Sequence, residues 1–204
     1  MPKITDIQIQ KNNKTRANVY IDGEFAYALD MLFIMKFGIK IGADVYEDIL
    51  TKALQDSERS VCFEKAMSYL SRGMKTVRQM RDYLLGKGYD NETVNYAIGK
   101  LTDYKYLNDE YYAQVYVEQN AATKGERRLK QELQQRGIPN SIAEKYCTTE
   151  PDVTAENAER LAEKYMRNKP RDLKTLSKLQ RYLLSRGYDF DVVNAVLRNY
   201  KTDD

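Results

Sequence analysis

The run Tyr83-Leu84-Leu85-Gly86-Lys87-Gly88-Tyr89-Asp90 recurs near the end of the chain as Tyr182-Leu183-Leu184-Ser185-Arg186-Gly187-Tyr188-Asp189. A looser copy, Glu132-Leu133-Gln134-Gln135-Arg136-Gly137-Ile138-Pro139, lies between them. The glycines Gly88, Gly137 and Gly187 are 49 and 50 residues apart. A period of this length is typical of stacked helical units, each too small to bury its own apolar face. We therefore expect function to lie on a repeated surface rather than in one pocket.

Apolar residues recur at helical spacing from Glu58 onward. The first repeat shows the i, i+3, i+4, i+7 pattern of a helix with one buried face at Phe63, Ala66, Met67 and Leu70. Two more such runs complete this repeat, and the other repeats follow the same plan. Three short helices can close a small bundle. The sequence thus predicts a mainly α fold of three tandem three-helix bundle repeats in an elongated array.

Turn chemistry supports these helices. Thr76 and Gln79 have the spacing of a capping box at a helix start. Gly88 follows Lys87 where a helix end needs a left-handed residue. Asp90 and its counterpart Asp189 are expected to cap the helices that follow.

Apolar and polar residues alternate with a period of two in the first thirty residues, which indicates strands with one solvent-exposed face. Asn12-Asn13 and Asp22-Gly23 fall where hairpin turns are expected. We predict a three-stranded antiparallel meander, then a short helix capped by Asp30 and stopped by Gly38, then a longer helix capped by Asp44. The predicted division is residues 1–57 for this small α+β N-terminal segment, then repeats at 58–105, 106–150 and 151–204.

Composition excludes several classes of function. The 204 residues hold 33 basic and 30 acidic side chains, so any nucleic-acid footprint must be local. There is no histidine, which removes the usual general base and the commonest zinc ligand. The two cysteines lie in helical sequence and suit a buried structural role. We expect no catalysis, no cofactor and no bound metal. No stretch has the length of a membrane span or signal sequence, which predicts a cytoplasmic chain without a membrane partner.

Basic residues recur at equivalent places in the second helix of each repeat. At 100° per residue they lie opposite the apolar stripe through Met80, Leu129 and Leu179. Such a face could bind phosphates or an acidic protein surface, while a solvated helix face is the alternative. The candidate binding residues are Lys75, Lys124, Arg127, Arg128, Lys174, Lys178 and Arg181.

Two other groups favour structural roles. Lys87, Arg136 and Arg186 precede the repeated glycines, where a cation interacts favourably with the last turn of a helix. The tyrosines between Tyr104 and Tyr116 stand beside acidic residues rather than basic ones. We therefore predict a packed joint there rather than a platform for stacked bases.

Ordered motifs across the repeats resemble the RecX family of recombination regulators. They are Tyr106-Leu107-Asn108-Asp109-Glu110-Tyr111-Tyr112-Ala113, Lys124-Gly125-Glu126-Arg127-Arg128-Leu129-Lys130-Gln131-Glu132-Leu133, Arg136-Gly137-Ile138 and, in the first repeat, Ala66-Met67-Ser68-Tyr69-Leu70-Ser71-Arg72. The likeness covers about residues 60 to 200, and the strand-rich segment before Glu58 lies outside it.

This resemblance implies a protein that binds the RecA filament on single-stranded DNA and reduces its ATP hydrolysis and strand exchange. We expect it to be a monomer. The alternative is a stand-alone helical repeat module that binds DNA without RecA, against which the near-neutral charge weighs. An enzyme would need converging carboxylates in a substrate-sized pocket.

Overall fold

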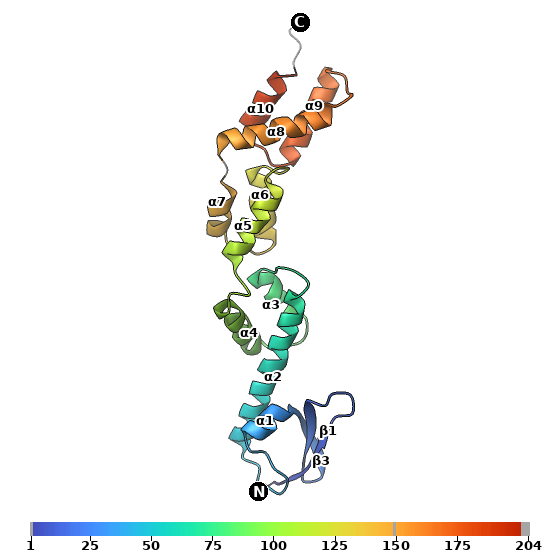
Figure 1. The fold of residues 1–204 in the computed structure, drawn as a ribbon, viewed down its shortest axis with the longest axis vertical. Helices are drawn as coiled ribbons and strands as arrows, with labels where there is room; N and C mark the ends of the chain where they lie inside the picture. Colours follow the sequence, from blue (N-terminus) through green and yellow to red (C-terminus); the bar gives the residue numbers. More distant parts are fainter. Residues whose placement is uncertain (1, 149, 201–204) are drawn as a thin grey trace. The chain divides into compact units, whose positions relative to one another are not determined.

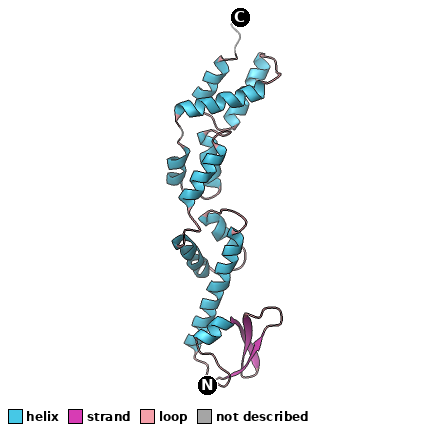
Figure 2. Cartoon of the chain, in the orientation of Figure 1, coloured by secondary structure: helices cyan, strands magenta, loops and turns pink. Residues whose placement is uncertain are grey.

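The computed structural model describes residues 2–148 and 150–200 of the chain, in which three strands are followed by ten helices (Figure 2). The strands are β1 (Ile4–Ile9), β2 (Arg16–Ile21) and β3 (Glu24–Asp30). The helices are α1 (Met31–Lys36), α2 (Glu47–Leu70), α3 (Val77–Leu85), α4 (Asn91–Asp103), α5 (Asp109–Asn120), α6 (Glu126–Gln135), α7 (Asn140–Cys147), α8 (Pro151–Met166), α9 (Leu173–Ser185) and α10 (Phe190–Arg198). The predicted fold class, a sheet followed by three-helix repeats, is confirmed.

The chain divides into two compact units. The first holds the described residues up to 73 together with 80–104, and the second holds 74–79 together with the described residues from 105 onward. The short segment 74–79, which opens α3, therefore belongs with the second unit.

The sheet of the first unit is an antiparallel meander in the order β1-β2-β3, as predicted. Asp22 and Gly23 both have positive φ, at 49° and 88°, which is the backbone of a tight two-residue hairpin turn. The inner face of the sheet contributes Ala17, Val19 and Leu29 to a core that α1 and the start of α2 complete. Figure 1 shows these two helices beside the strands.

One continuous helix, α2, links this core to the first repeat. Its 24 residues run past residue 57 without a break, because no glycine or proline interrupts them. Tyr46 occupies its N-cap position and makes no side-chain capping bond. The prediction that Asp44 caps this helix is wrong, since Asp44 instead pairs with Lys3 in an isolated antiparallel bridge.

Most of the other predicted caps are confirmed. The Asp30 carboxylate accepts the Leu32 N–H, and Gly38 ends the short helix with a φ of 64°. The Thr76 hydroxyl accepts the Gln79 N–H, and the Gln79 side chain accepts the Thr76 N–H, both at 3.1 Å. Asp90 caps α4 through the Thr93 N–H. Asp189 occupies the equivalent N-cap position of α10 but makes no such bond.

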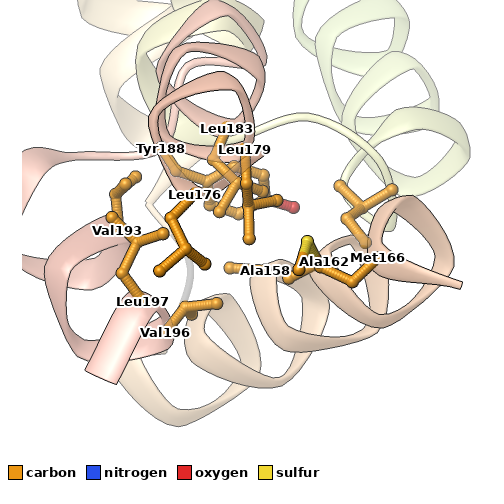
Figure 3. Close-up of a cluster of buried hydrophobic side chains, with 11 residues drawn as sticks. Ala158, Ala162, Met166, Leu176, Leu179, Leu183, Tyr188, Val193, Val196 and Leu197 are labelled. Atoms are coloured by element: carbon orange, nitrogen blue, oxygen red, sulfur yellow. The ribbon is translucent and has the colours of Figure 1, made fainter. Parts of the chain in front are cut away.

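The third repeat shows how a bundle closes. Side chains from α8, α9 and α10 point toward one another in Figure 3, with Leu179, Leu183 and Val193 fully buried. Ala158, Ala162 and Met166 of α8 lie in the same cluster. The second repeat has its own core, built around Ala113, Leu129 and Leu133.

A recurring contact, which we call the glycine joint, occurs twice in the second unit. The second helices of the three repeats are α3, α6 and α9. At each joint, the first residues of one of these helices lie against the glycine that follows the second helix of the next repeat. At the first joint the Thr76 hydroxyl donates to the Arg136 carbonyl at 2.6 Å. At the second joint the Gly125 N–H donates to the Arg186 carbonyl at 2.9 Å. Both joints therefore use the carbonyl immediately before the repeated glycine.

Neither glycine could carry a side chain in this arrangement. A Cβ at Gly137 would lie 2.3 Å from the Cβ of Arg78, and one at Gly187 would lie 2.4 Å from the Arg128 backbone nitrogen. Both glycines also have a left-handed backbone, with φ of 87° and 91°. Gly88 has the same backbone, with φ of 90°, but an added Cβ would meet nothing within 4 Å.

These three positions give a matched prediction. Gly88→Ala should cost about 1–2 kcal/mol, because only its left-handed backbone is strained. Gly187→Ala should lower the free energy of unfolding by about 1–3 kcal/mol more than Gly88→Ala does, since its methyl group also overlaps the α6 backbone. Urea unfolding of the variants measures the difference. Equal losses at both positions would show that the joint does not constrain the glycine.

Candidate partner-binding surface

The structure draws one of the candidate cations, Lys124, into the second bundle. Its ammonium group lies 2.6 Å from the Glu132 carboxylate and 3.1 Å from the Tyr116 hydroxyl, and its side chain is only 20% exposed. Helical spacing placed Lys124 on the outer face of the repeat. The geometry differs, because α5 brings Tyr116 alongside this position. Lys124 is therefore paired within the second bundle.

Glu132 is the centre of this network. The Arg128 Nε also donates to its carboxylate, at 2.7 Å, and the Tyr116 hydroxyl donates to it as well. Burial alone would raise the pKa of Glu132, but the hydrogen bonds from Lys124, Tyr116 and Arg128 outweigh it and lower the pKa to about 2. A buried carboxylate is thus held ionised by three donors.

The two arginines in the first turn of α6 lie at the glycine joint. The Arg127 guanidinium donates to the Leu184 carbonyl of α9 at 3.0 Å, and the Arg128 backbone lies against Gly187. Both side chains remain exposed to solvent. The structure therefore brings these cations of the second repeat to the helix that carries the basic residues of the third.

Lys174, Lys178 and Arg181 are exposed along one face of α9. Their spacing of four and three residues keeps them in line, and the apolar side chains Leu176, Leu179 and Leu183 take the buried face. Within residues 150–200 neither lysine makes an ion pair. We call Lys174, Lys178 and Arg181 the α9 basic face. It is the part of the predicted stripe that the structure leaves open.

Lys75 is half-buried, and its ammonium group donates to the Met74 carbonyl at 3.3 Å. It lies in the 74–79 segment, so all seven candidate residues belong to the second unit. The structure joins Arg127 and Arg128 to the end of α9, and it uses Lys124 internally.

The cations before the repeated glycines each lie over a tyrosine ring. Lys87 is 5.5 Å from the centre of Tyr83, and Arg186 is 5.1 Å from that of Tyr182. Arg136 is 4.6 Å from the Tyr116 ring. Two of these pairs carry a signal in the sequence, a tyrosine four residues before the cation, which puts both on one helix face. The three cations therefore pack on tyrosine rings in addition to lying at helix ends, where the sequence predicts them.

Three tyrosines of the predicted joint are largely exposed. Tyr104, Tyr106 and Tyr111 each keep more than half of their surface exposed, at 56%, 55% and 57%. Tyr112 and Tyr116 do pack against the core of the second repeat. Runs of aromatic residues at a helix start do not show which rings face inward.

The described surface has several open hollows. One, of about 1120 Å³, lies along α2 beside the sheet, and Glu47, Asp48 and Asp56 are among the residues that line it. Another, of about 410 Å³, holds Glu159 and Glu163 of α8 together with three cations, Arg167, Lys169 and Arg171. The described residues include no group of three or more side chains placed to hold a metal ion. Among them there is also no helix with the length and apolar character needed to cross a membrane.

Family models match the chain in four consecutive segments. Residues 2–46 match the Regulatory protein RecX N-terminal domain. Residues 62–101, 108–146 and 152–197 match the first, second and third three-helix domains of RecX.

The chain belongs to the RecX family.

Similar proteins extend over nearly the whole chain. A Regulatory protein RecX of Clostridium tetani is 36% identical and aligns with 96% of this chain and 93% of its own length. That of Clostridium perfringens strain 13 is 34% identical, with 97% and 96% aligned. The crystal structure of a regulatory protein RecX gives a TM-score of 0.73 at 27% identity, covering 98% of this chain and 100% of that one. A RecX structure from Lactobacillus salivarius gives 0.64 at 26% identity, covering 70% and 96%.

The match at residues 2–46 corrects one expectation. The resemblance noted in the sequence began near residue 60 and left the strand-rich segment outside it. That segment is instead a domain of the RecX family in its own right. Its signal is a period-two pattern rather than a motif, and this pattern alone names no family.

The Glu132 network predicts a dependence of stability on pH. Because the folded pKa of about 2 lies below the usual value of 4.5, the network stabilises the fold above pH 4.5. This contribution should fall as the pH drops from 4.5 toward 2. Glu132→Gln should cost roughly 1–3 kcal/mol near neutral pH by leaving Lys124 without its charged partner. Its unfolding should also depend less on pH than that of the wild type in this window.

Thermal unfolding followed by circular dichroism between pH 2 and 7 measures both effects. Glu144→Gln is the control, since Glu144 lies on the same bundle but is exposed. An identical pH profile for wild type and Glu132→Gln would contradict the assignment.

Proposed function

We propose that this protein binds the RecA filament assembled on single-stranded DNA and lowers its ATPase and strand-exchange activity, using the α9 basic face as its main contact. Membership of the RecX family along the whole chain supports this function. The observation that carries the choice of surface is the exposure of Lys174, Lys178 and Arg181 along one side of a well-packed helix.

Electrostatics favour an acidic or phosphate-bearing partner for this face. Lys174 and Lys178 are close enough to Asp172 to help lower the pKa of its carboxyl, whose main stabilisation is the hydrogen bond from the Thr175 N–H. Asp172 is thus occupied as the N-cap of α9 and leaves the lysines without a strong internal partner. Cations arranged in this way are available to an external anion.

Arg127 and Arg128 extend the contact from the neighbouring repeat. Both remain exposed while their backbone and part of their hydrogen bonding hold the joint. We assign Lys124 a structural role only, because its charge is paired with Glu132. Several weak contacts on linked repeats can together bind far more strongly than any one of them. A polymer of identical subunits offers the repeated partner that such a chain requires.

Reversing the charge of the α9 basic face tests this proposal. The variant Lys174→Glu/Lys178→Glu/Arg181→Glu should need about tenfold more protein for half-inhibition of the RecA ATPase, which corresponds to about 1.4 kcal/mol of binding. The residues are exposed, so the fold should persist. The ATPase of RecA on single-stranded DNA is measured during titration with each protein.

The matched control is Lys11→Glu/Lys14→Glu/Lys40→Glu, which changes the net charge equally at exposed positions of the N-terminal domain. The control should inhibit like the wild type. Equal weakening by both variants would show that only net charge matters, and an unchanged ATPase at saturating wild-type protein would reject the regulatory function. If the α9 variant loses binding to naked DNA but still inhibits RecA, DNA contact is a separate property of this face.

A further inference from the structure

The glycine joint is used twice within the chain, yet three copies of its glycine exist. Gly187 is buried at the second joint and Gly137 is half-buried at the first. Gly88, with the same left-handed backbone, is exposed and has open space around it. Leu85, which corresponds to the half-buried Leu184, is 38% exposed. Among the described residues, none lies against Gly88 as Arg78 lies against Gly137, so the end of α3 is a free copy of the joint surface.

The start of one second helix, α9, is also free of such a contact among the described residues. The residues that open α3 and α6 are engaged at Arg136 and Arg186, whereas among the described residues those that open α9 make no such contact. Leu173, the first residue of α9, is 84% exposed, the highest value among the large apolar side chains of the described residues. Its neighbours Asp172 and Lys174 are exposed too. The Leu173 side chain thus lies almost entirely in solvent.

We propose that two copies of this chain associate head to tail, with the start of α9 from one copy docked on residues 85–88 of another through a third glycine joint. The two free surfaces are of the kinds that already meet twice in the chain. Asp172 occupies the N-cap position that Gly125 holds in α6, and its backbone N–H donates to the Lys87 carbonyl as that of Gly125 does to Arg186. Leu173 packs on Leu85 beside Gly86.

Charge and size set the strength of this contact. Asp172 and Lys174 lie on one side of the contact and Lys87 and Asp90 on the other, so each surface carries one charge of each sign. A single helix start covers far less than the roughly 1,000 Å² of a stable interface, so free copies associate weakly. Such a contact is heterologous and gives open chains rather than closed dimers. The first residue of α9 lies 14 residues before Gly187, whereas α3 and α6 each begin 11 residues before their glycine. The docked copy is therefore displaced by about one helical turn relative to the spacing between repeats within a chain.

The contact itself does not depend on the proposed function, although it would act together with it. Copies bound next to one another on a polymer have a high effective concentration, and a weak contact between them then makes their binding cooperative.

Cross-linking between engineered cysteines tests the inference on the full-length protein alone. Leu85→Cys and Leu173→Cys are made separately and mixed at high concentration with a short bismaleimide. We expect a cross-linked dimer in the mixture that exceeds severalfold the product of either variant alone. A chain carrying both changes should give a ladder of longer species. Cys62 and Cys147 should stay unreactive, because burial raises the pKa of both thiols to about 11.

The control replaces Leu85→Cys by Tyr96→Cys, a position on α4 with a similar exposure of 44%. Equal yields from both pairs, or no dimer from the Leu85 pair, would overturn the head-to-tail contact. Adding Gly88→Leu to the Leu85→Cys chain should abolish the dimer, and circular dichroism checks that this chain is folded. If the dimer is absent while RecA inhibition is intact, only this inference fails. If the ladder forms but RecA is unaffected, only the proposed function fails.

Discussion

The second unit depends on the close approach of a helix start to a glycine backbone. At Gly187 the α6 backbone comes so near that a methyl group would overlap the Arg128 nitrogen. This approach lets the Gly125 N–H reach the Arg186 carbonyl, and each of these groups belongs to a helix end that lacks its own partner. One hydrogen bond at the joint therefore pairs an N–H at the start of α6 with a carbonyl at the end of α9. Because the glycine carries no side chain, the start of the second helix can approach its backbone this closely.

The same geometry decides which cations remain available. The bundle of the second repeat buries a carboxylate, Glu132, and must surround it with donors, so Lys124 and part of Arg128 are used there. In the third repeat the equivalent position to Glu132 is Tyr182, which stacks on Tyr165 instead. With no buried acid to neutralise, the lysines of α9 stay in solvent. The difference between Glu132 in the second repeat and Tyr182 in the third thus explains why Lys124 is paired and Lys174 is exposed.

Much of the fold follows from local rules. Period-two and helical spacing, the Asp30 cap, the Thr76 capping box and the left-handed glycines could all be read from the sequence because each depends on residues a few positions apart. The inward turn of Lys124 could not, since it depends on Tyr116 of another helix. The exposed tyrosines and the failure of Asp44 as a cap have the same cause. Periodicity assigns a residue to one side of a helix but does not show what covers that side.

The continuous helix α2 has a consequence for how the first unit loses its structure. Leu50 and Ala53 lie in the core beneath the sheet, while Cys62 and Ala66 are buried further along the same helix. An unbroken ladder of backbone hydrogen bonds connects these two regions. Amide hydrogens along α2 should then exchange as one cooperative block, and a protease should find no accessible linker at which to release the strands from the first bundle.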